Sequence, residues 1–371
     1  MKQKIIVGAI AIIFLGAVII TRYYSTNIEP SDGLEIVASG LEIPWSITFS
    51  SNGHLYFTER PGRVNVIRAG EVHILLSLEV AARPGREGGL LGIELDPNFT
   101  SNKYLYIYYT YGEGSQRWNR VSRYTETGDK LTDEIIILDN IPAGDNHNGG
   151  RIKFGPDEKL YVTTGETFRG ELAQDLDNLG GKILRMNSDG SIPNDNPFPG
   201  SLIYTYGNRN PQGLTWHPET GELYSTEHGP SGENLQFAHD EINLIQPGNN
   251  YGWPYIVEDG DDNRYVDPIY HTGTTTWAPS GATFYSGNRY PQWKNKLFIA
   301  TLRGKQLRVV TLTPDHARVE SIFSLYEGTH GRIRDVVQGV DGYLYFCTSN
   351  RDGRGTPSES DDIIVKILQA P

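Results

Sequence analysis

The chain has almost no sulfur and little positive charge. Cys347 is the single cysteine among 371 residues and there are two methionines, so no intramolecular disulfide can form. Cys347 lies in an apolar segment, where a free thiol behaves as a small buried side chain. Lysine and arginine total 33 against 45 aspartate and glutamate, which gives a formal net charge of −12. Non-specific nucleic-acid binding needs a basic face, so the composition argues against that class of protein.

Strong helical periodicity, low-complexity tracts and local zinc motifs are also missing. The best candidate for a helix is the segment 171–179, and its signal is weak. The sequence has no His-x-x-x-His pair and no cysteine cluster, so it contains no zinc pattern. No second domain boundary is visible after residue 33.

One long apolar run stands at the N-terminus. Lys2 and Lys4 precede the run, which extends from Ile5 to Ile20. At 1.5 Å per residue the run spans roughly 24 Å, somewhat short for a bilayer core. The lysines place the following chain outside the cytoplasm, and no clear small-x-small cleavage site follows the run. We expect residues 1–32 to be a signal or anchor segment with its linker, with the anchor favoured, and the protein to be extracytoplasmic, touching the membrane only there.

A short strand signature recurs along the rest of the chain. Each copy is a turn followed by Leu-Tyr or Leu-Phe within an apolar strand, and the copies begin at Leu55, Leu105, Leu160, Leu223, Leu297 and Leu344. Neighbouring copies are 50, 55, 63, 74 and 47 residues apart. A repeat of roughly 40 to 50 residues is typical of one four-stranded blade of a β-propeller, and longer intervals indicate loop insertions. The sequence therefore predicts an all-β fold, a six-bladed β-propeller of four-stranded antiparallel blades over residues 33–371.

The two ends of the predicted propeller both read as strands. One strand is expected over residues 34–38 and the other over 363–368. In a closed propeller the two chain ends often share a blade, which removes exposed strand edges. We predict that these two strands pair with each other.

A histidine in a glycine-rich loop is the first candidate for chemistry. Residues 145–151 read Asp-Asn-His-Asn-Gly-Gly-Arg and stand just before the third Leu-Tyr strand. The pKa of histidine lies near neutrality, so His147 can act as a general base. The alternative is a histidine that is solvated or hydrogen-bonded for structural reasons.

Four arginines stand next to strands of the repeat, namely Arg209, Arg303, Arg332 and Arg334. Arg209 and Asn210 lie in a rigid turn, where a guanidinium suits a planar carboxylate or a quinone oxygen. Strand alternation places Arg332 and Arg334 on one face. In a propeller such positions can meet at one mouth of the central channel. The alternative is that these arginines tie loops together or lie on a solvated edge.

Acidic and turn-rich segments follow the fourth strand of the repeat, at residues 226–230, 240–243 and 247–254. Backbone carbonyls of a tight turn and a carboxylate together form a hard-oxygen site that suits Ca²⁺. Because acidic loops are common, the spacing alone is a weak signal.

Eight short strings occur in a fixed order along residues 34–368. They are Gly-Gly-Leu-Leu-Gly (88–92), His-Asn-Gly-Gly-Arg (147–151), Arg-Asn-Pro-Gln-Gly (209–213), Glu-His-Gly-Pro (227–230), Asp-Glu-Ile-Asn (240–243), Asn-Tyr-Gly-Trp-Pro (250–254), Ala-Pro-Ser (278–280) and Arg-x-Arg-Asp (332–335). As an ordered set they resemble the PQQ-dependent sugar dehydrogenases, the family of soluble glucose dehydrogenase and aldose sugar dehydrogenase. The compact length is similar to the aldose sugar dehydrogenase branch.

The resemblance implies a role for each matching residue. His147 would take the hydroxyl proton at C1 of an aldose sugar while hydride passes to PQQ, giving the lactone, and an external acceptor would then receive the electrons. The residues implied to hold PQQ are Glu87, Arg209, Asn210, Arg303, Arg332 and Arg334. Backbone oxygens of Gly229 and Pro230 would bind a Ca²⁺ that also touches PQQ. Glu241 and the Tyr251 carbonyl would bind a second, structural Ca²⁺.

Two positions depart from the family pattern. Glu87 stands where glutamine is usual, and Arg303 stands where lysine is usual. Glu87 adds a negative charge beside an anionic cofactor, and Arg303 keeps the positive charge without the compact ammonium. Two alternatives therefore stay open: a propeller that binds a carbohydrate or a protein partner without redox chemistry, and a calcium-dependent lactonase-type hydrolase. The preferred sugar and the electron acceptor are not encoded in these motifs.

Overall fold

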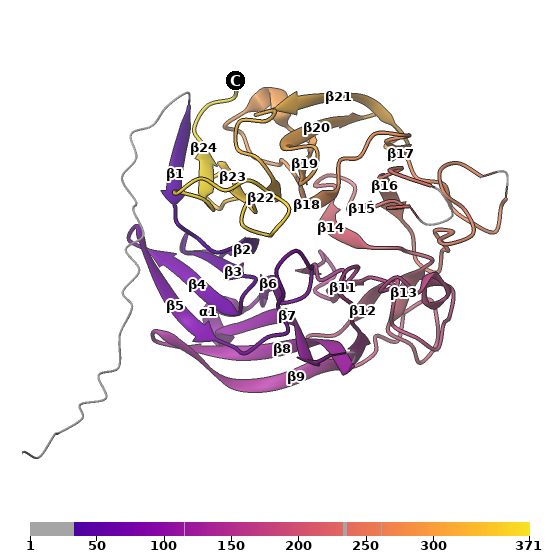
Figure 1. Ribbon diagram of the computed structural model, residues 1–371, viewed down its shortest axis with the longest axis horizontal. Coiled ribbons are helices and arrows are strands. Elements are labelled where there is room, and N and C mark those ends of the chain that lie inside the picture. Colours follow the sequence, from indigo (N-terminus) through magenta and orange to yellow (C-terminus); the bar gives the residue numbers. More distant parts are fainter. Residues whose placement is uncertain (1–32, 115, 233–235, 261) are drawn as a thin grey trace, which may run out of the picture.

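The computed structural model describes residues 33–371 apart from positions 115, 233–235 and 261. In this part of the chain the strands form six four-stranded sheets arranged around a central axis (Figure 1). Neighbouring strands of each sheet whose register is resolved are antiparallel. The predicted six-bladed propeller is therefore confirmed.

The first three blades follow the chain in order. They are β2 (Pro44–Phe49), β3 (Leu55–Glu59), β4 (Arg63–Arg68) and β5 (Glu71–Ser77); β6 (Leu90–Leu95), β7 (Tyr104–Glu113), β8 (Gln116–Thr127) and β9 (Lys130–Pro142); and β10 (Ile152–Phe154), β11 (Leu160–Thr164), β12 (Lys182–Met186) and β13 (Ile203–Tyr206).

The remaining blades complete the ring. They are β14 (Pro211–Trp216), β15 (Leu223–Glu227), β16 (Glu241–Ile245) and β17 (Tyr270–His271); β18 (Pro279–Phe284), β19 (Leu297–Thr301), β20 (Gln306–Leu312) and β21 (Val319–Leu325); and β22 (Ile333–Gln338), β23 (Leu344–Thr348) and β24 (Ile364–Ile367) together with β1 (Leu34–Ala38). Short helical turns occur as α1 (Phe99–Asn102), η1 (Gly170–Ala173) and η3 (Pro291–Trp293). The segment 171–179, the best helix candidate in the sequence, forms only η1.

The Leu-Tyr signature marks the second strand of every blade. These strands are β3, β7, β11, β15, β19 and β23, and all except β7 are buried at every position. A second strand is covered on both faces by the neighbouring blades, so its sequence is apolar without strict alternation. This is why the repeat is legible in the sequence.

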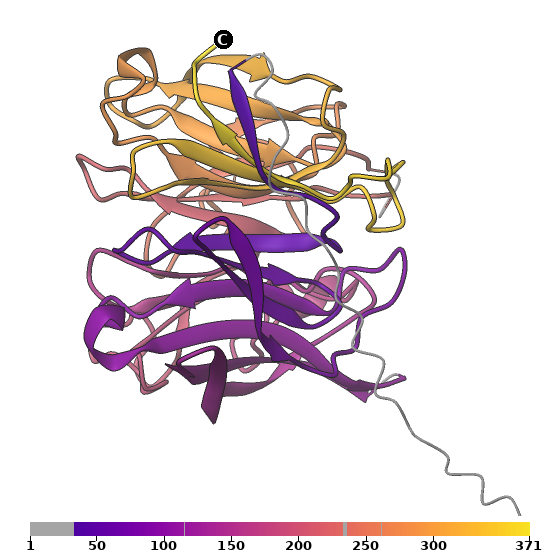
Figure 2. The ribbon, with the colours of Figure 1, turned by 90° about the vertical axis from the view of Figure 1, so that its left-hand side faces the viewer.

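The ring closes by the predicted pairing of the two chain ends. β1 runs antiparallel to β24, with Leu34 opposite Ile367 and Ile36 opposite Val365. Figures 1 and 2 show the indigo β1 beside the yellow strands of the last blade. Cys347 is fully buried in β23 of this blade, as its apolar surroundings predicted.

The N-terminal segment, residues 1–32, lies outside the described residues, so its assignment as a signal or anchor segment stays a prediction. In the described part of the chain no helix has the length and apolarity needed to span a membrane.

A buried ion pair joins four blades at the axis. Arg151 and Asp335, each 2% exposed, are 2.9 Å apart between Nη1 and Oδ2. Arg151 also donates to the Ser46 hydroxyl at 2.8 Å and to the Gln212 carbonyl at 2.9 Å. Asp335 accepts the Ile47 N–H at 2.9 Å. Because these partners come from the first, fourth and sixth blades and from the entrance of the third, the pair fixes where the innermost strands begin.

We expect Asp335→Asn to destabilise the protein by about 3 to 5 kcal/mol, because it leaves the Arg151 charge buried without its partner. The measurement is the free energy of unfolding from denaturant titration. Asp129→Asn is the matched control, since Asp129 pairs with Arg68 at 3.0 Å but is 90% exposed, and it should change stability by less than about 1 kcal/mol. Equal effects of the two substitutions would contradict the central role of the pair.

Candidate active site

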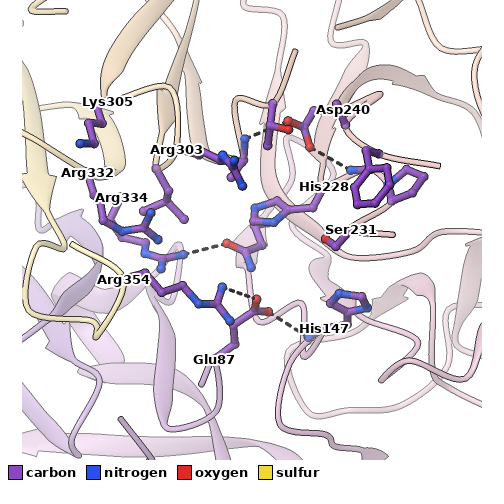
Figure 3. Close-up of a pocket in the computed structure, with 18 residues that line it drawn as sticks. Glu87, His147, His228, Ser231, Asp240, Arg303, Lys305, Arg332, Arg334 and Arg354 are labelled. Carbon is purple, nitrogen blue, oxygen red and sulfur yellow. Dashed lines mark hydrogen bonds and ion pairs between the residues drawn. The ribbon is translucent and has the colours of Figure 1, made fainter. Parts of the chain in front are cut away.

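A cavity of about 600 Å³ opens at one mouth of the channel. Its wall comes from the starts of first strands and from the loops after second strands, which lie at the same end of every antiparallel blade. The charged and imidazole side chains of the wall are Glu87, His147, His228, Asp240, Arg303, Lys305, Arg332, Arg334 and Arg354. Figure 3 shows the cationic side chains gathered on one side and His147 on the other.

His147 is held by a carboxylate behind it. Its Nδ1 lies 2.6 Å from Oε1 of Glu166, and both residues are buried. The ring of Phe168 covers one face of the imidazole at a centroid distance of 3.9 Å. Because Glu166 occupies Nδ1, Nε2 is the nitrogen left for a ligand. This is the geometry of a base whose tautomer and orientation are set by a third group.

The loop that carries His147 cannot relax away from β11. His147 itself has φ +56°, and Gly149 has φ +61°. A Cβ at Gly149 would stand 2.5 Å from the Thr163 carbonyl oxygen, so only glycine fits there. This close approach of Gly149 to Thr163 fixes the position of the loop that carries the His147 imidazole.

Glu87 lies beside His147 as an ionised carboxylate. Its Oε2 accepts the His147 backbone N–H at 2.9 Å and the Asn210 side-chain amide at 3.2 Å, and its Oε1 lies 3.2 Å from Nη1 of Arg354. Burial raises the pKa of Glu87, but His147, His228 and Arg354 outweigh burial and lower this pKa to about 2. The Glu87 carboxylate therefore stays negatively charged at neutral pH, and it is paired with Arg354.

The opposite wall is strongly cationic. Arg332 pairs with Asp352 at 2.9 Å, whereas Arg334 donates to the Gln212 side-chain oxygen at 2.8 Å and stays 3.9 Å from Asp352. Burial, and to a lesser degree Arg332, lower the pKa of Arg334 to about 10 although Asp352 opposes this. Within the described residues neither Arg303 nor Lys305 has a carboxylate within ion-pair distance. Such a wall attracts an anionic ligand.

His228 contributes a neutral imidazole between these two sides. Burial lowers the pKa of His228 to about 3. The charge of Glu87 opposes this shift, and the charges of Arg334 and Arg209 add to it. Its Nε2 is buried and has no hydrogen-bond partner among the described residues. A buried nitrogen of this kind costs free energy unless a ligand or water satisfies it.

A second, much smaller cavity lies behind Gly229 and Pro230. Its volume is about 10 Å³, the space of one water-sized sphere, and Arg209, Glu227, Glu241 and Tyr251 are among its walls. Burial raises the pKa of Glu227 to about 7. Burial and then the Glu227 carboxylate raise the pKa of Glu241 to about 8. A buried acid, Glu227, and a partly buried one, Glu241, that repel each other form a site that a hard divalent cation would stabilise.

The turn between the two cavities is fixed by backbone contacts. Gly229 donates its N–H to Asp240 at 2.9 Å, and the Pro230 carbonyl accepts the Ala238 N–H at 3.0 Å. A Cβ at Gly229 would stand 1.9 Å from the Ala238 carbonyl oxygen, so glycine is required there. Each carbonyl oxygen has two lone pairs, so the Pro230 oxygen can still bind a cation.

The residues singled out in the sequence fall into three places. Glu87, His147, Gly229, Pro230, Arg303, Arg332 and Arg334 line the large cavity, Arg209, Glu241 and Tyr251 line the small one, and Asn210 lines neither but donates its side-chain amide to Glu87 in the wall of the large one. Their roles toward a cofactor or metal stay predictions.

Three side chains of the site had no sequence signal of their own. Glu166 stands just after the end of a Leu-Tyr strand, a position that many residue types occupy. Arg354 and Lys305 lie in loops of the last two blades and reach the cavity only through ring closure.

Comparison with known proteins identifies a matching family and several similar chains. The family described as glucose/sorbosone dehydrogenase matches residues 41–364. The aldose sugar dehydrogenase YliI of Escherichia coli is 32% identical, over 86% of this chain and 91% of its own. A Thermus structure described as a putative oxidoreductase (glucose dehydrogenase) is 44% identical with a TM-score of 0.84, covering 90% of this chain and 99% of that one. The PQQ-bound aldose sugar dehydrogenase of Streptomyces coelicolor is 36% identical with a TM-score of 0.78, covering 90% and 97%.

The raised pKa values of Glu227 and Glu241 predict a pH-dependent stability. The folded protein keeps protons on these carboxyls that the unfolded chain releases, so without a cation the free energy of unfolding should fall as pH rises from about 4.5 to about 8. Calcium should remove this fall by stabilising the carboxylates. The measurement is the thermal midpoint against pH, in chelator and in Ca²⁺.

Glu241→Gln should flatten the chelator curve relative to wild type and abolish most of the calcium effect. The exposed Glu320→Gln on β21 is the control and should leave both unchanged. A calcium effect that survives Glu241→Gln would show that the cation binds elsewhere.

Proposed function

The chain belongs to the glucose/sorbosone dehydrogenase family, and we propose that it is a PQQ- and calcium-dependent aldose dehydrogenase that oxidises the sugar at C1 to the lactone. The observation that carries this proposal is the placement of the His147–Glu166 pair across one cavity from a cluster of arginines. A proton acceptor and an anion-binding wall are what this reaction requires of the protein.

The described residues fit PQQ, a flat quinone with three carboxylates. Arg303, Arg332 and Arg334 would bind its carboxylates, and Glu87, Arg209 and Asn210 would position it from the other side. Two buried nitrogens of the wall, Nε of Arg334 and Nε2 of His228, lack hydrogen-bond partners among the described residues. A polar ligand in the cavity would supply them. The volume, about 600 Å³, lies within the range of cofactor pockets.

Two calcium ions would occupy different positions. The backbone oxygens of Gly229 and Pro230 would hold one beside the cofactor. Glu241 and the Tyr251 carbonyl would hold the other in the small cavity, and we add Glu227 to its environment because the two carboxyls face the same space. Calcium prefers such oxygen ligands.

The protein's own part in the reaction is to hold and move a proton. PQQ, when bound, would supply the acceptor for the hydride of C1, and calcium would supply Lewis acidity. Nε2 of His147 takes the proton of the C1 hydroxyl, so that carbon and oxygen are left as the lactone carbonyl. Glu166, 2.6 Å from Nδ1, stabilises the imidazolium that forms. Glu87 adds a second negative charge close to this imidazolium.

We further propose that residues 33–371 are the catalytic domain, that residues 1–32 deliver or anchor it outside the cytoplasm, and that an external acceptor reoxidises the cofactor. These assignments rest on the apolar run and its lysines.

One observation favours a cofactor-free carbohydrate-binding propeller as the second candidate. Glu87 is ionised in the cavity that an anionic cofactor would enter. The pairing with Arg354 offsets this charge, which is why we rank the dehydrogenase first. A lactonase-type site would need an acidic metal cage, and the described wall of the cavity has two acids against five cationic side chains.

We expect the full-length protein to reduce an artificial electron acceptor with aldose sugars only when both PQQ and Ca²⁺ are added. His147→Asn should lower kcat by about 10²- to 10⁴-fold, because it removes the general base while keeping a polar side chain of similar size. The measurements are steady-state dye reduction and the PQQ absorbance retained after desalting.

His73→Asn is the control, since the His73 side chain is 42% exposed on β5, the outer strand of the first blade, and does not line the cavity. Unchanged turnover in His147→Asn with PQQ retained would remove His147 from the mechanism. Absence of both turnover and PQQ retention in the wild type would instead favour the cofactor-free propeller.

The Glu87–Arg354 pair gives a separate prediction about cofactor affinity. Arg354→Gln should weaken PQQ binding by about tenfold, because the Glu87 carboxylate then faces the cofactor without its partner. Glu87→Gln with Arg354→Gln should recover most of this loss. Affinity is measured by absorbance titration without sugar. A double variant as weak as Arg354→Gln would mean that Arg354 binds the cofactor itself and does not serve to neutralise Glu87.

A further inference from the structure

We propose that His239, Glu258 and His271 bind a divalent transition-metal ion of the zinc class, and that this ion braces the wall of the large cavity. One ligand nitrogen of each histidine and one carboxylate oxygen of Glu258 all lie within 4.8 Å of one another. The three side chains come from separate segments: the approach to β16, the insertion between β16 and β17, and β17 itself.

In His239 one ring nitrogen is available to a metal ion. Its Nδ1 is shielded from solvent and makes no hydrogen bond among the described residues. Oε1 of Glu258 lies 3.4 Å away, too far for a hydrogen bond of normal length but on the correct side to share an ion. Asp259, next to Glu258, brings Oδ2 to 3.9 Å from Nε2 of His271 and supplies a possible fourth ligand.

His271 would give up one weak contact on binding. The Gly273 N–H donates to Nδ1 of His271 at 3.2 Å. A neutral imidazole has a single lone pair, so coordination through either nitrogen breaks this hydrogen bond. Gly273 is only half-buried, and water can solvate its N–H after the exchange. The cost is therefore small beside that of a metal–imidazole bond.

The ligand set selects the class of ion. Two imidazoles and a carboxylate suit Zn²⁺, Co²⁺, Ni²⁺ or Cu²⁺, whereas Ca²⁺ prefers oxygen ligands alone. Metal–ligand distances of about 2.0 to 2.2 Å require the ligand atoms to close by about an ångström. Glu258 lies outside any strand and can supply that movement. The site is thus different in chemistry from the calcium positions proposed above.

The position of His239 connects the ion to the cavity. Its neighbours Ala238 and Asp240 both line the wall, and Ala238 is bonded to the Pro230 carbonyl. Asp240 receives the N–H groups of Gly229, Trp277 and Ala278. An ion at His239 would cross-link this wall to the insertion that carries Glu258. It would hold the Gly229–Pro230 turn in place without touching any ligand in the cavity.

The test measures zinc on the chelator-treated, full-length protein in excess Ca²⁺, which fills hard-oxygen sites. Equilibrium dialysis should give one more equivalent of Zn²⁺ on the wild type than on His271→Gln or on His239→Gln. Co²⁺ should give visible ligand-field bands with the wild type that both variants lose. Zn²⁺ should raise the thermal midpoint of the wild type and not that of the variants.

His73→Gln is the matched control, because His73 also stands near a carboxylate, with Nε2 4.0 Å from Glu71, but is exposed on β5. It should bind Zn²⁺ as the wild type does. A calcium-induced rise of the thermal midpoint in each variant shows that it is folded, and Glu258→Gln replaces either histidine variant that is not. Equal zinc binding by wild type and folded variants, or no zinc binding by the wild type, would overturn the proposal and leave an ordinary cluster of histidines and carboxylates.

Discussion

The buried ion pair between Arg151 and Asp335 is the constraint on which the site depends. Arg151 lies four residues after His147, and Asp335 follows Arg334 directly. Their contact at 2.9 Å therefore sets the distance between His147 on one side of the cavity and the arginines on the other. Burying two charges is expensive, and hydrogen bonds to Ser46, Ile47 and Gln212 offset part of the cost, although Nη2 of Arg151 has no hydrogen-bond partner among the described residues. The same bonds hold four blades in register, so the fold and the site share one anchor.

The charged side chains of the cavity form two groups. Glu87 and Arg354 neutralise each other next to His147. In the other group Arg332 pairs with Asp352, whereas Arg303 has no acidic partner among the described residues. A glutamate at position 87 would otherwise oppose an anionic ligand. Arg354 comes from the loop after β23 and reaches Glu87 in the loop before β6, and it also donates to the Asn146 side-chain oxygen, in the loop between β9 and β10, at 2.6 Å. The departure from the family pattern at Glu87 is thus accompanied by a cation that the strings at residues 88–92 and 147–151 do not include.

The fold was largely predictable because its signal is local. Each second strand is buried on both faces, so six apolar Leu-Tyr segments show the six blades, and the strands at the two chain ends could be paired by the need to close the ring. Site residues that belong to contiguous strings, such as His147 and Arg332, were predictable through resemblance. Glu166 and Arg354 were not, because neither belongs to such a string: Glu166 meets His147 only through the pairing of β10 with β11, and Arg354 meets Glu87 only through closure of the ring. The cluster of His239, Glu258 and His271 is the extreme case, with intervals of 19 and 13 residues that match no local metal motif.

The two sides of the cavity differ in how firmly they are built. The part of the wall that carries His147 is held by short connections. His147 is five residues from β10, Gly149 is packed against Thr163, and Glu166 is two residues past β11. Another part of the wall is the segment between β15 and β18, where a blade's third and fourth strands are separated by 24 residues from 246 to 269. The Gly229–Pro230 turn in this segment is held by a hydrogen bond from the Gly229 N–H to the Asp240 carboxylate and by one from the Ala238 N–H to the Pro230 carbonyl. The proposed proton transfer to Nε2 of His147 needs a rigidly held imidazole, whereas the proposed binding of a sugar tolerates a longer, adjustable wall. An ion that braces this wall from behind would therefore act on affinity and specificity more than on proton transfer.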